Sequence, residues 1–443
     1  MSARTSFVRA SRGQWSSEPA FIFSMAAAAV GLGNLWRFPY ILGANGGGAF
    51  LIAYFAAIII IVLPLMILEV AAGRLAQGSV VATFRQVNRF GTVYGWFVVL
   101  VTTIITSYYL VITGWTLGYA VDALRGELRP FDAFSTGYNS LWFFLIVTVL
   151  VGAVLIRGVA LIERLSWVLM PVLLLVMIGL VVAASRTPGW AQAKDFFFQV
   201  DFSRLADGRL WVFAFGQAFY SLAIGQGYLV TYGSFIPQKT HVPRASVIVA
   251  ATETSVALLA GWMIFPFLFS HGLAPDEGSQ LAFVTLPRVF ENMAGGSWIA
   301  ILFFGLFFVA AFSSSVAGTK VLVAAVAEEL RLTNTTAVIT VTALLLVLGS
   351  ASALSFTPLN WQIAGEPVLD VLDRVAGGNL VIFSGVVGAA LLCWFVPANR
   401  IVGVLGARGW WWEWRIYLIG RLLPLALLLW VMISHALTLI DAA

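Results

Sequence analysis

The sequence has little charge, little cysteine and little histidine, and each shortage excludes a class of function. Asp, Glu, Lys and Arg make up 10% of the 443 residues, against about 25% in soluble domains. One cysteine, Cys393, excludes an intrachain disulfide and a multi-cysteine metal site. The three histidines lie far apart in the sequence, at His241, His271 and His435, and neither HExxH nor GxSxG occurs. We therefore expect no enzyme.

Long apolar segments dominate what is present. Hydrophobic residues make up 60% of the chain and the mean hydropathy is +0.95. Runs of about 20 apolar residues cross the hydrocarbon core of a bilayer. The sequence predicts an all-α polytopic membrane protein with eleven transmembrane helices, at 15–41, 48–73, 92–123, 140–156, 165–184, 211–236, 243–270, 297–327, 336–354, 377–397 and 416–437.

The distribution of charge predicts the orientation. Basic residues lie at the N-terminus and after the second, sixth and tenth spans, at Arg4, Arg9, Arg12, Arg74, Arg85, Arg89, Lys239, Arg244, Arg400, Arg408 and Arg415. Acidic residues concentrate after the seventh and ninth spans. The positive-inside rule places the N-terminus in the cytoplasm and, after eleven spans, the C-terminus outside the plasma (inner) membrane. No cleavage site for a signal peptide is recognised. The net charge of +5 needs no nucleic-acid partner, because the arginines already set the topology.

Two predicted spans are interrupted by glycine near mid-depth. The first contains Gly31, Gly33 and Asn34, and the sixth contains Gly225 and Gly227. Unwound backbone in a membrane is tolerated where it lines a cavity. Two breaks five spans apart indicate an inverted repeat, spans 1 to 5 against 6 to 10, with a midplane site for ions and solute. The alternative is that the glycines allow close helix packing.

Several long motifs in order carry a resemblance to a known family. They are AVGLGNLWRFPY at 29–40, NGGGAF at 45–50, PLMILEVAAGR at 64–74, SYYLVITGWTLGY at 107–119 and GQAFYSLAIGQG at 216–227. Over about residues 12 to 397 the chain resembles the neurotransmitter:sodium symporter family, in its bacterial amino-acid branch.

The resemblance implies the leucine-transporter fold. Residues 1–400 would form a transporter core of five-plus-five inverted repeats, and 401–443 a C-terminal eleventh helix. It implies sodium-coupled import of an amino acid or similar zwitterion by alternating access. The alternatives are a proton-coupled or sodium-independent carrier and a sodium-dependent sensor that does not transport. The expected partners are a zwitterionic small molecule, sodium ions and the lipid bilayer, with the chain a monomer or weak homodimer.

Two sodium sites are implied by the resemblance. The second site would combine backbone carbonyls of the first span with hydroxyls of the eighth, a set of hard oxygen ligands, at Ala27, Val30, Ala310, Ser313 and Ser314. Alternatively, the serines bond to their own helix. The first site would use Ala29, Asn34, Ser221 and Glu253.

Glu253 is the main departure from the family pattern, which usually has asparagine at this position. Tyr54, Gln217 and Ser221 match positions that hold chloride in animal members, whereas Glu253 and Ala257 replace the other two. Our hypothesis is that Glu253 replaces chloride, and that it takes up a proton on the return step. The alternative is a structural glutamate, although acids inside membranes are usually functional.

The substrate is expected to carry its own carboxylate. Relatives that select amines have an aspartate where this chain has Gly31. The resemblance implies a substrate site at Ala29, Gly31, Gly33, Ile105, Tyr109, Tyr220, Ser221, Ala223, Gln226, Ser314 and Gly318. Ala223 and Gly318 predict a pocket larger than that of a leucine-selective member, and Gln226 makes it more polar. A β-amino or sulfonic acid stays an alternative.

Two gates and two further charges complete these expectations. Arg37 and Asp373 match the outer pair of the family, with Tyr109 and Tyr220 as a lid, although Arg37 alone would also suit an anchor at the interface. The inner gate would be Arg12, Trp15 and Glu328, without the usual tyrosine at Phe235. Glu69 is expected to support the first break, and Lys320 to snorkel towards the cytoplasm.

Overall fold

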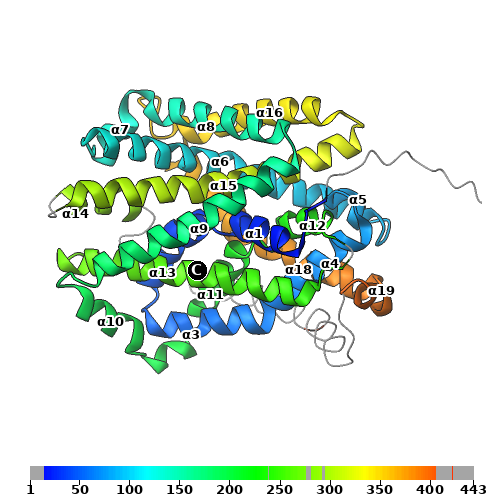
Figure 1. Ribbon diagram of the computed structural model, residues 1–443, viewed down its shortest axis with the longest axis horizontal. Helices are drawn as coiled ribbons and strands as arrows, with labels where there is room; N and C mark the ends of the chain where they lie inside the picture. Colours follow the sequence, from blue (N-terminus) through cyan, green and yellow to red (C-terminus); the bar gives the residue numbers. More distant parts are fainter. Residues whose placement is uncertain (1–13, 238, 276–280, 292–294, 406–421, 423–443) are drawn as a thin grey trace, which may run out of the picture.

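The chain is a bundle of membrane-spanning helices, seen here in a computed structural model that describes residues 14–237, 239–275, 281–291, 295–405 and 422. Eight helices of this described part are long and apolar enough to cross a bilayer, and a ninth span is a bent pair. Figure 1 shows α6, α8 and α16 on one side of the bundle and α3 and α10 on the other, with α1 and α12 between them. The predicted all-α membrane fold is confirmed.

The first half contains spans 1 to 5. The first span is α1 (Glu18–Ala29), η1 (Gly33–Arg37) and α2 (Phe38–Ala44), and the second is α3 (Gly48–Ala57), η2 (Ile58–Val62) and α4 (Leu63–Ala76). Spans 3, 4 and 5 are α6 (Gly91–Arg125), α8 (Asn139–Ile156) and α9 (Val159–Ala184). Short elements connect them, namely α5 (Val80–Arg85), α7 (Phe131–Ser135) and η3 (Thr136–Tyr138).

The second half contains spans 6 to 10. The sixth is α11 (Gly208–Ser221) with α12 (Tyr228–Gly233), the seventh α13 (Val242–Ser270), the eighth α15 (Gly296–Glu329) and the ninth α16 (Asn334–Leu354). The tenth is continuous through α17 (Val368–Leu372), η7 (Asp373–Leu380) and α18 (Val381–Phe395). Outside the spans lie α10 (Trp190–Phe198), η4 (Phe202–Ala206), η6 (Leu281–Thr285), α14 (Leu286–Glu291) and α19 (Ala398–Gly403). The hairpin β1 (Gln362–Ile363) and β2 (Glu366–Pro367) precedes α17.

Span bounds differ from the predicted ones where an apolar count misses a helix end. The fifth helix begins at Val159, before the predicted 165, because Glu163 and Arg164 lower the local hydropathy. The tenth begins at Val368, before the predicted 377, because its first turns contain Asp370, Asp373 and Arg374. The predicted eleventh span, 416–437, lies outside the described residues, and so does most of the segment 401–443.

Both predicted helix breaks are present. The helices on either side of the first break are bent by 48°. The sixth span stops at Ser221 and resumes at Tyr228. Helix α1 packs against α9, α13 and α15, which brings the first break to the centre of the bundle. The candidate site lies at these breaks.

Candidate functional site

Side chains satisfy the unwound backbone of the first span. Helix α1 is capped by Ser17 and ends at Ala29, and the next residue, Val30, is extended. Beyond it, the Gly31 N–H donates to Asn34 Oδ1 at 3.1 Å, and the Leu32 N–H donates to the Tyr109 hydroxyl at 2.8 Å. The amide of Gln217, on α11, donates to the Gly33 carbonyl at 2.8 Å. Side chains from three spans thus hold groups that the helix cannot pair itself.

The break in the sixth span is supported by side chains from three other spans. Ala223, Gly225 and Gly227 have positive φ, which only glycine adopts without strain. The Glu69 carboxylate accepts the Gly225 N–H at 2.8 Å, the Ser384 hydroxyl donates to the Gly225 carbonyl at 2.6 Å, and Thr102 donates to the Gln226 carbonyl at 2.7 Å.

The expectation for Glu69 needs correction. It bonds to the sixth span, whereas the sequence led us to expect support of the first break. The reason is packing, because α4 lies directly against α12. Ser384 and Thr102 gave no signal in the sequence, since hydroxyls on helices most often bond to their own backbone.

Glu253 lies at the centre of a polar cluster formed by three spans. It is fully buried. Its Oε1 accepts hydrogen bonds from Asn34 Nδ2 at 2.6 Å and from the Ser221 hydroxyl, and its Oε2 accepts one from Thr254 at 3.3 Å. Asn34, Ser221 and Glu253, all predicted for one cation site, are therefore in contact. The groups that could bind a cation here are a carboxylate, a hydroxyl and a side-chain amide.

Two buried polar atoms beside this cluster have no hydrogen-bond partner. They are the hydroxyl of Tyr54 and Oε1 of Gln217. Both residues were matched to chloride-holding positions. Ala257, at another of these positions, is buried and apolar. The unpaired Gln217 oxygen is an acceptor and suits a cation at this place, whereas the Tyr54 hydroxyl can donate or accept.

The residues of the second predicted cation site also lie together. The Ser314 hydroxyl donates to the carbonyls of Ala28 at 2.9 Å and Val30 at 3.0 Å, and Ser313 donates to Ala310 at 2.9 Å. Besides Val30, the carbonyl that Ser314 contacts is that of Ala28, while Ala27 lines a cavity next to Ser313. Oxygen groups of α1 and α15 thus face each other across the break, which suits a hard cation.

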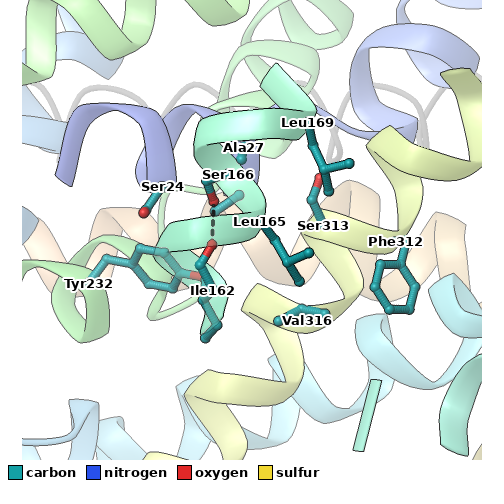
Figure 2. A pocket seen from close by; sticks show the side chains of 11 residues that line it. Ser24, Ala27, Ile162, Leu165, Ser166, Leu169, Tyr232, Phe312, Ser313 and Val316 are labelled. Carbon is teal, nitrogen blue, oxygen red and sulfur yellow. Dashed lines mark hydrogen bonds between the residues drawn. The ribbon is translucent and has the colours of Figure 1, made fainter. Parts of the chain in front are cut away.

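A small cavity lies next to these serines. Its volume is about 20 Å³, enough for one water molecule. Figure 2 shows Ser24, Ser166, Tyr232 and Ser313 around it, and the Ser166 hydroxyl bonds to the Ile162 carbonyl at 2.9 Å. Ala27 also lines the cavity. The Ser24 hydroxyl is buried without a partner.

The residues expected around the substrate are buried between the two breaks. A side chain at Gly31 would collide with the hydroxyls of Tyr109 and Ser314, and one at Gly33 would meet the Tyr220 ring at 3.3 Å. The Gln226 amide donates to the Tyr220 carbonyl at 3.3 Å. Gln226 is buried, and so are four further members of the set, Ala29, Ile105, Ser221 and Ala223.

One expectation about this pocket is wrong. Gly318 does not enlarge it, because the Tyr228 side chain fills the space that the missing side chain leaves. Tyr228 was overlooked because it follows the break by one residue and belongs to no motif that we interpreted.

The predicted outer pair is close but makes no ion pair. Within the described part of the chain, no acidic group lies within 4 Å of Arg37. Instead, its guanidinium lies 4.6 Å from the centre of the Tyr220 ring, and the Tyr108 hydroxyl donates to Asp373 at 2.8 Å. Arg37 is only 8% exposed, and its Nε and Nη1 have no hydrogen-bond partner. An anchor in contact with the lipid headgroups would be more exposed than this.

At the inner side, Arg12 lies outside the described residues. Trp15 is buried and donates its indole N–H to the Tyr232 carbonyl at 3.1 Å, and its backbone N–H to the Phe235 carbonyl at 3.0 Å. Lys320 is 8% exposed, and its Nζ lies 5.7 Å from the centre of the Phe235 ring. The Lys320 ammonium thus lies over the ring of Phe235, the residue that replaces the usual tyrosine of the family.

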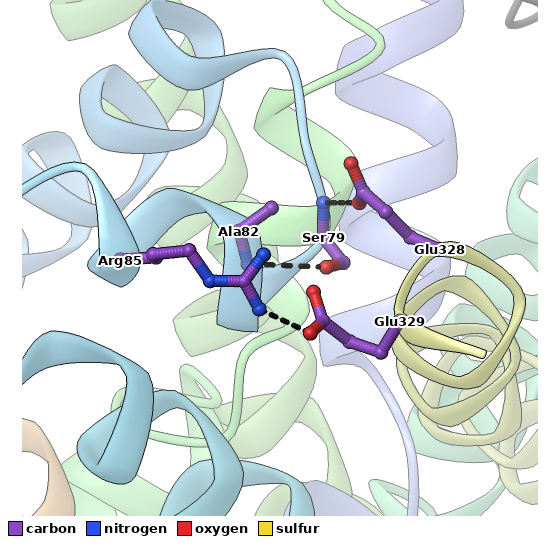
Figure 3. Close-up of polar contacts among 5 residues, drawn as sticks. All are labelled: Ser79, Ala82, Arg85, Glu328 and Glu329. Carbon is purple, nitrogen blue, oxygen red and sulfur yellow. Dashed lines mark hydrogen bonds and ion pairs between the residues drawn. The ribbon is translucent and has the colours of Figure 1, made fainter. Parts of the chain in front are cut away.

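Glu328, the acidic residue expected in the inner gate, makes a hydrogen bond at the start of α5. Its Oε2 accepts the Ser79 N–H at 2.6 Å, directly before α5, whereas the neighbouring Glu329 pairs with Arg85 (Figure 3). The Ser79 hydroxyl caps the same helix by accepting the Ala82 N–H at 3.3 Å. The eighth span is thus bonded to the segment between spans 2 and 3, a contact that the sequence did not predict.

The broken spans and the polar groups gathered between them define a polytopic secondary transporter. The profile of the Sodium:neurotransmitter symporter family matches residues 12–141 and 135–440. The chain belongs to that family, whose members couple solute movement to sodium.

Relatives and a solved structure agree. A sodium-dependent transporter of Haemophilus influenzae is 31% identical over 410 residues, which are 87% of this chain and 89% of that one. The sodium-dependent transporter YhdH of Bacillus subtilis is 31% identical over 444 residues, 94% of this chain and 96% of that one. The crystal structure of MhsT in complex with L-phenylalanine matches with a TM-score of 0.88 at 32% identity, and the match covers 95% of this chain and 99% of MhsT.

Proposed function

We propose that this protein imports a zwitterionic amino acid together with sodium, and that it works without chloride. The support for an amino acid is chemical. The first break lacks a carboxylate at Gly31, so the substrate has to bring one, and the Tyr109 hydroxyl lies against that glycine. MhsT was solved with L-phenylalanine, and a human relative, 23% identical over 96% of this chain and 80% of its own length, is a sodium- and chloride-dependent neutral and basic amino acid transporter.

The oxygen groups at the two breaks would hold two sodium ions. The first would take Asn34, Ser221, Glu253 and the Ala29 carbonyl, and the second would take Ser313, Ser314 and the carbonyls of Ala27, Val30 and Ala310. Sodium prefers such oxygen ligands. The first site lies beside Gly31, so a substrate carboxylate would share its ion. That shared ion would couple substrate binding to sodium.

The observation that carries chloride independence is the Glu253 carboxylate, bonded to both Asn34 and Ser221. When ionised, this carboxylate would supply negative charge at the position where animal members hold chloride. A second anion would be repelled at this distance, while the carboxylate balances the charge of sodium. A proton that replaces sodium on Glu253 during the return step would export acid.

Alternating access would follow from the gates. Arg37, Tyr220 and Asp373 would close the outer side above the substrate with Tyr109, and Arg12, Trp15 and Glu328 the inner side. Spans 1, 2, 6 and 7 would move against the others, with the N-terminus in the cytoplasm and the C-terminus outside the plasma membrane. The inner closure here has Lys320 over Phe235 as an additional contact.

Two measurements test this function. A thermal-shift screen of all amino acids, taurine and betaine, with sodium and with potassium, should show a sodium-linked stabilisation by the substrate. Uptake of that compound into proteoliposomes should then need a sodium gradient and continue after gluconate replaces chloride. Stabilisation without uptake would indicate a sensor. Uptake driven by a pH gradient without sodium would indicate a proton-coupled carrier, and a requirement for chloride would overturn the role of Glu253.

A further inference from the structure

The space beside Gly318 is filled by a residue from another span. Gly318 lies on α15 among the residues expected to surround the substrate side chain. A Cβ built there would collide with the Tyr228 hydroxyl, and would lie 2.8 Å from Thr106 Oγ1 and 3.2 Å from Tyr228 Cζ. Tyr228 begins α12, immediately after the break in the sixth span. The Tyr228 side chain therefore occupies the space that a larger residue at position 318 would need.

The groups that face Gly318 are hydroxyls. Thr106 is 2% exposed, and its Oγ1 makes no hydrogen bond of good geometry, although the Tyr228 hydroxyl lies beside it. Most buried threonines on helices bond to a carbonyl of the preceding turn, as Thr103 does to Val99 and Thr113 to Tyr109 on the same helix. Thr106 is an exception on α6, and an unpaired buried hydroxyl costs stability unless something else binds it.

The position of Thr106 points to the substrate as that partner. It lies one residue after Ile105 and one turn before Tyr109, both of which belong to the expected substrate site. Tyr228 follows Gln226 by two residues, and the Gln226 carbonyl is held by Thr102, one turn before Thr106. The hydroxyls of Thr106 and Tyr228 thus meet at Gly318, one turn along α15 from Ser314, which lies against Gly31.

We propose that Tyr228 and Thr106 form the polar end of the side-chain subsite, and that they select an amino acid with a short, neutral, hydrogen-bonding side chain. This inference rests on the proposed function. The hydroxyls of threonine and tyrosine both donate and accept, so they suit a hydroxyl or a carboxamide. Neither hydroxyl is charged, so the two could not balance the charge of an acidic or basic substrate side chain. The Tyr228 ring removes the room that a large apolar side chain would need.

Selectivity of this kind is strong when a site is built to bind a polar group. A substrate that lacks the group leaves buried hydroxyls unpaired, and the discrimination exceeds that of an apolar pocket. The wild-type protein should therefore bind serine, threonine, asparagine or glutamine more tightly than alanine, valine, leucine or phenylalanine. Gln226 lies in the same region, but its amide is directed to the Tyr220 carbonyl, so we assign the selection to the two hydroxyls.

The test is a comparison of pairs with the same shape. Sodium-linked thermal shifts of the purified full-length protein would give the affinity for threonine against valine and for asparagine against leucine. Tyr228→Phe and Thr106→Val each remove one hydroxyl and keep the volume. Each should lower the preference for the polar member by about tenfold, with little change for the apolar member. Tyr119→Phe and Thr148→Val are controls, because they remove buried hydroxyls from α6 and α8 that bond to Phe283 and Phe144, and the preference should be unchanged.

Volume gives a second test. Tyr228→Ala should open the space beside Gly318, so that leucine or phenylalanine gains affinity relative to alanine by about tenfold. A wild-type preference for apolar side chains, an equal loss for both members of a pair in Tyr228→Phe, or no gain of large substrates in Tyr228→Ala would overturn the inference and leave the proposed function intact. The absence of a sodium-linked shift with any amino acid would count against both.

Discussion

Asn34 donates its side-chain amide twice to Glu253, to the carboxylate at 2.6 Å and to the backbone carbonyl at 3.1 Å. The first break is thereby tied to the seventh span at the level where the sixth span unwinds. Because Ser221 bonds to the same carboxylate oxygen, one acidic group connects three spans. An ion bound to this carboxylate would therefore change the contacts of all three spans.

Glu253→Gln should lower the apparent affinity for sodium by about tenfold or more, because a hydrogen bond to a charged group contributes about 1.5–3 kcal/mol. It should also make uptake respond to chloride, since the carboxylate that would balance the sodium charge is gone. The measurement is initial uptake into proteoliposomes as a function of sodium, with chloride or gluconate. Glu291→Gln, at an exposed position, is the control. Unchanged sodium dependence in Glu253→Gln would show a structural glutamate.

Ser314→Ala should weaken sodium binding by at least about fivefold, because its hydroxyl lies against the carbonyls of Ala28 and Val30. Ser313→Ala should act in the same direction. The readout is the sodium concentration that gives half of the maximal thermal shift at saturating substrate. Ser255→Ala removes an exposed hydroxyl that bonds to its own helix, and it should leave that concentration unchanged. An equal effect of all three variants would contradict a sodium site at α15.

Gly31→Ala should abolish substrate binding while the protein still folds. A methyl group there would collide with the hydroxyls of Tyr109 and Ser314. Gly179→Ala is a matched control on α9, where a methyl group meets nothing within 4 Å. That substitution should stabilise the helix by about 0.5–1 kcal/mol and leave transport intact. Melting temperature and uptake, measured for both variants, separate loss of the site from loss of the fold.

Arg37→Ala should reduce transport by about thirtyfold, because a desolvated cation over an aromatic ring contributes about 2 kcal/mol and the buried guanidinium lies over Tyr220. Arg37→Lys should retain part of the activity. Arg374→Ala is the control, since this side chain is 59% exposed and pairs with Glu366 at the surface, where such pairs contribute about 0–1 kcal/mol. Transport by Arg37→Ala equal to wild type would favour an interfacial anchor.

Glu328→Ala should loosen the inner side. Its carboxylate holds the Ser79 N–H, so amides of α5 should exchange with solvent faster in the variant. Glu329→Gln loses a pair with Arg85, whose side chain is 48% exposed at the end of the same helix, and should speed exchange less than Glu328→Ala does. Hydrogen exchange of the peptide that covers residues 79–85, with and without sodium, is the measurement. Equal exchange in Glu328→Ala and Glu329→Gln would show that Glu328 does not hold this segment.

Much of the fold could be predicted because hydropathy and glycine act locally. A run of apolar residues has to cross the bilayer whatever its neighbours are, so most described spans lie where the sequence placed them. Glycine pairs in such a run mark unwound backbone, and both breaks formed at the predicted residues. Asn34, Ser221 and Glu253 also met as expected, since their positions follow the family pattern even though the glutamate itself departs from it.

The sequence could not decide which distant side chain contacts each unwound backbone group, buried charge or glycine. Glu69 bonds to the sixth span and not the first, Arg37 lies on a ring without an ion pair, and Tyr228 fills the space beside Gly318. These contacts depend on how helices rotate and how far they approach, which is set by packing over the whole bundle. The sequence by itself thus determined a sodium-coupled membrane transporter with two broken helices, and the tertiary structure decided the shape and polarity of the site between them.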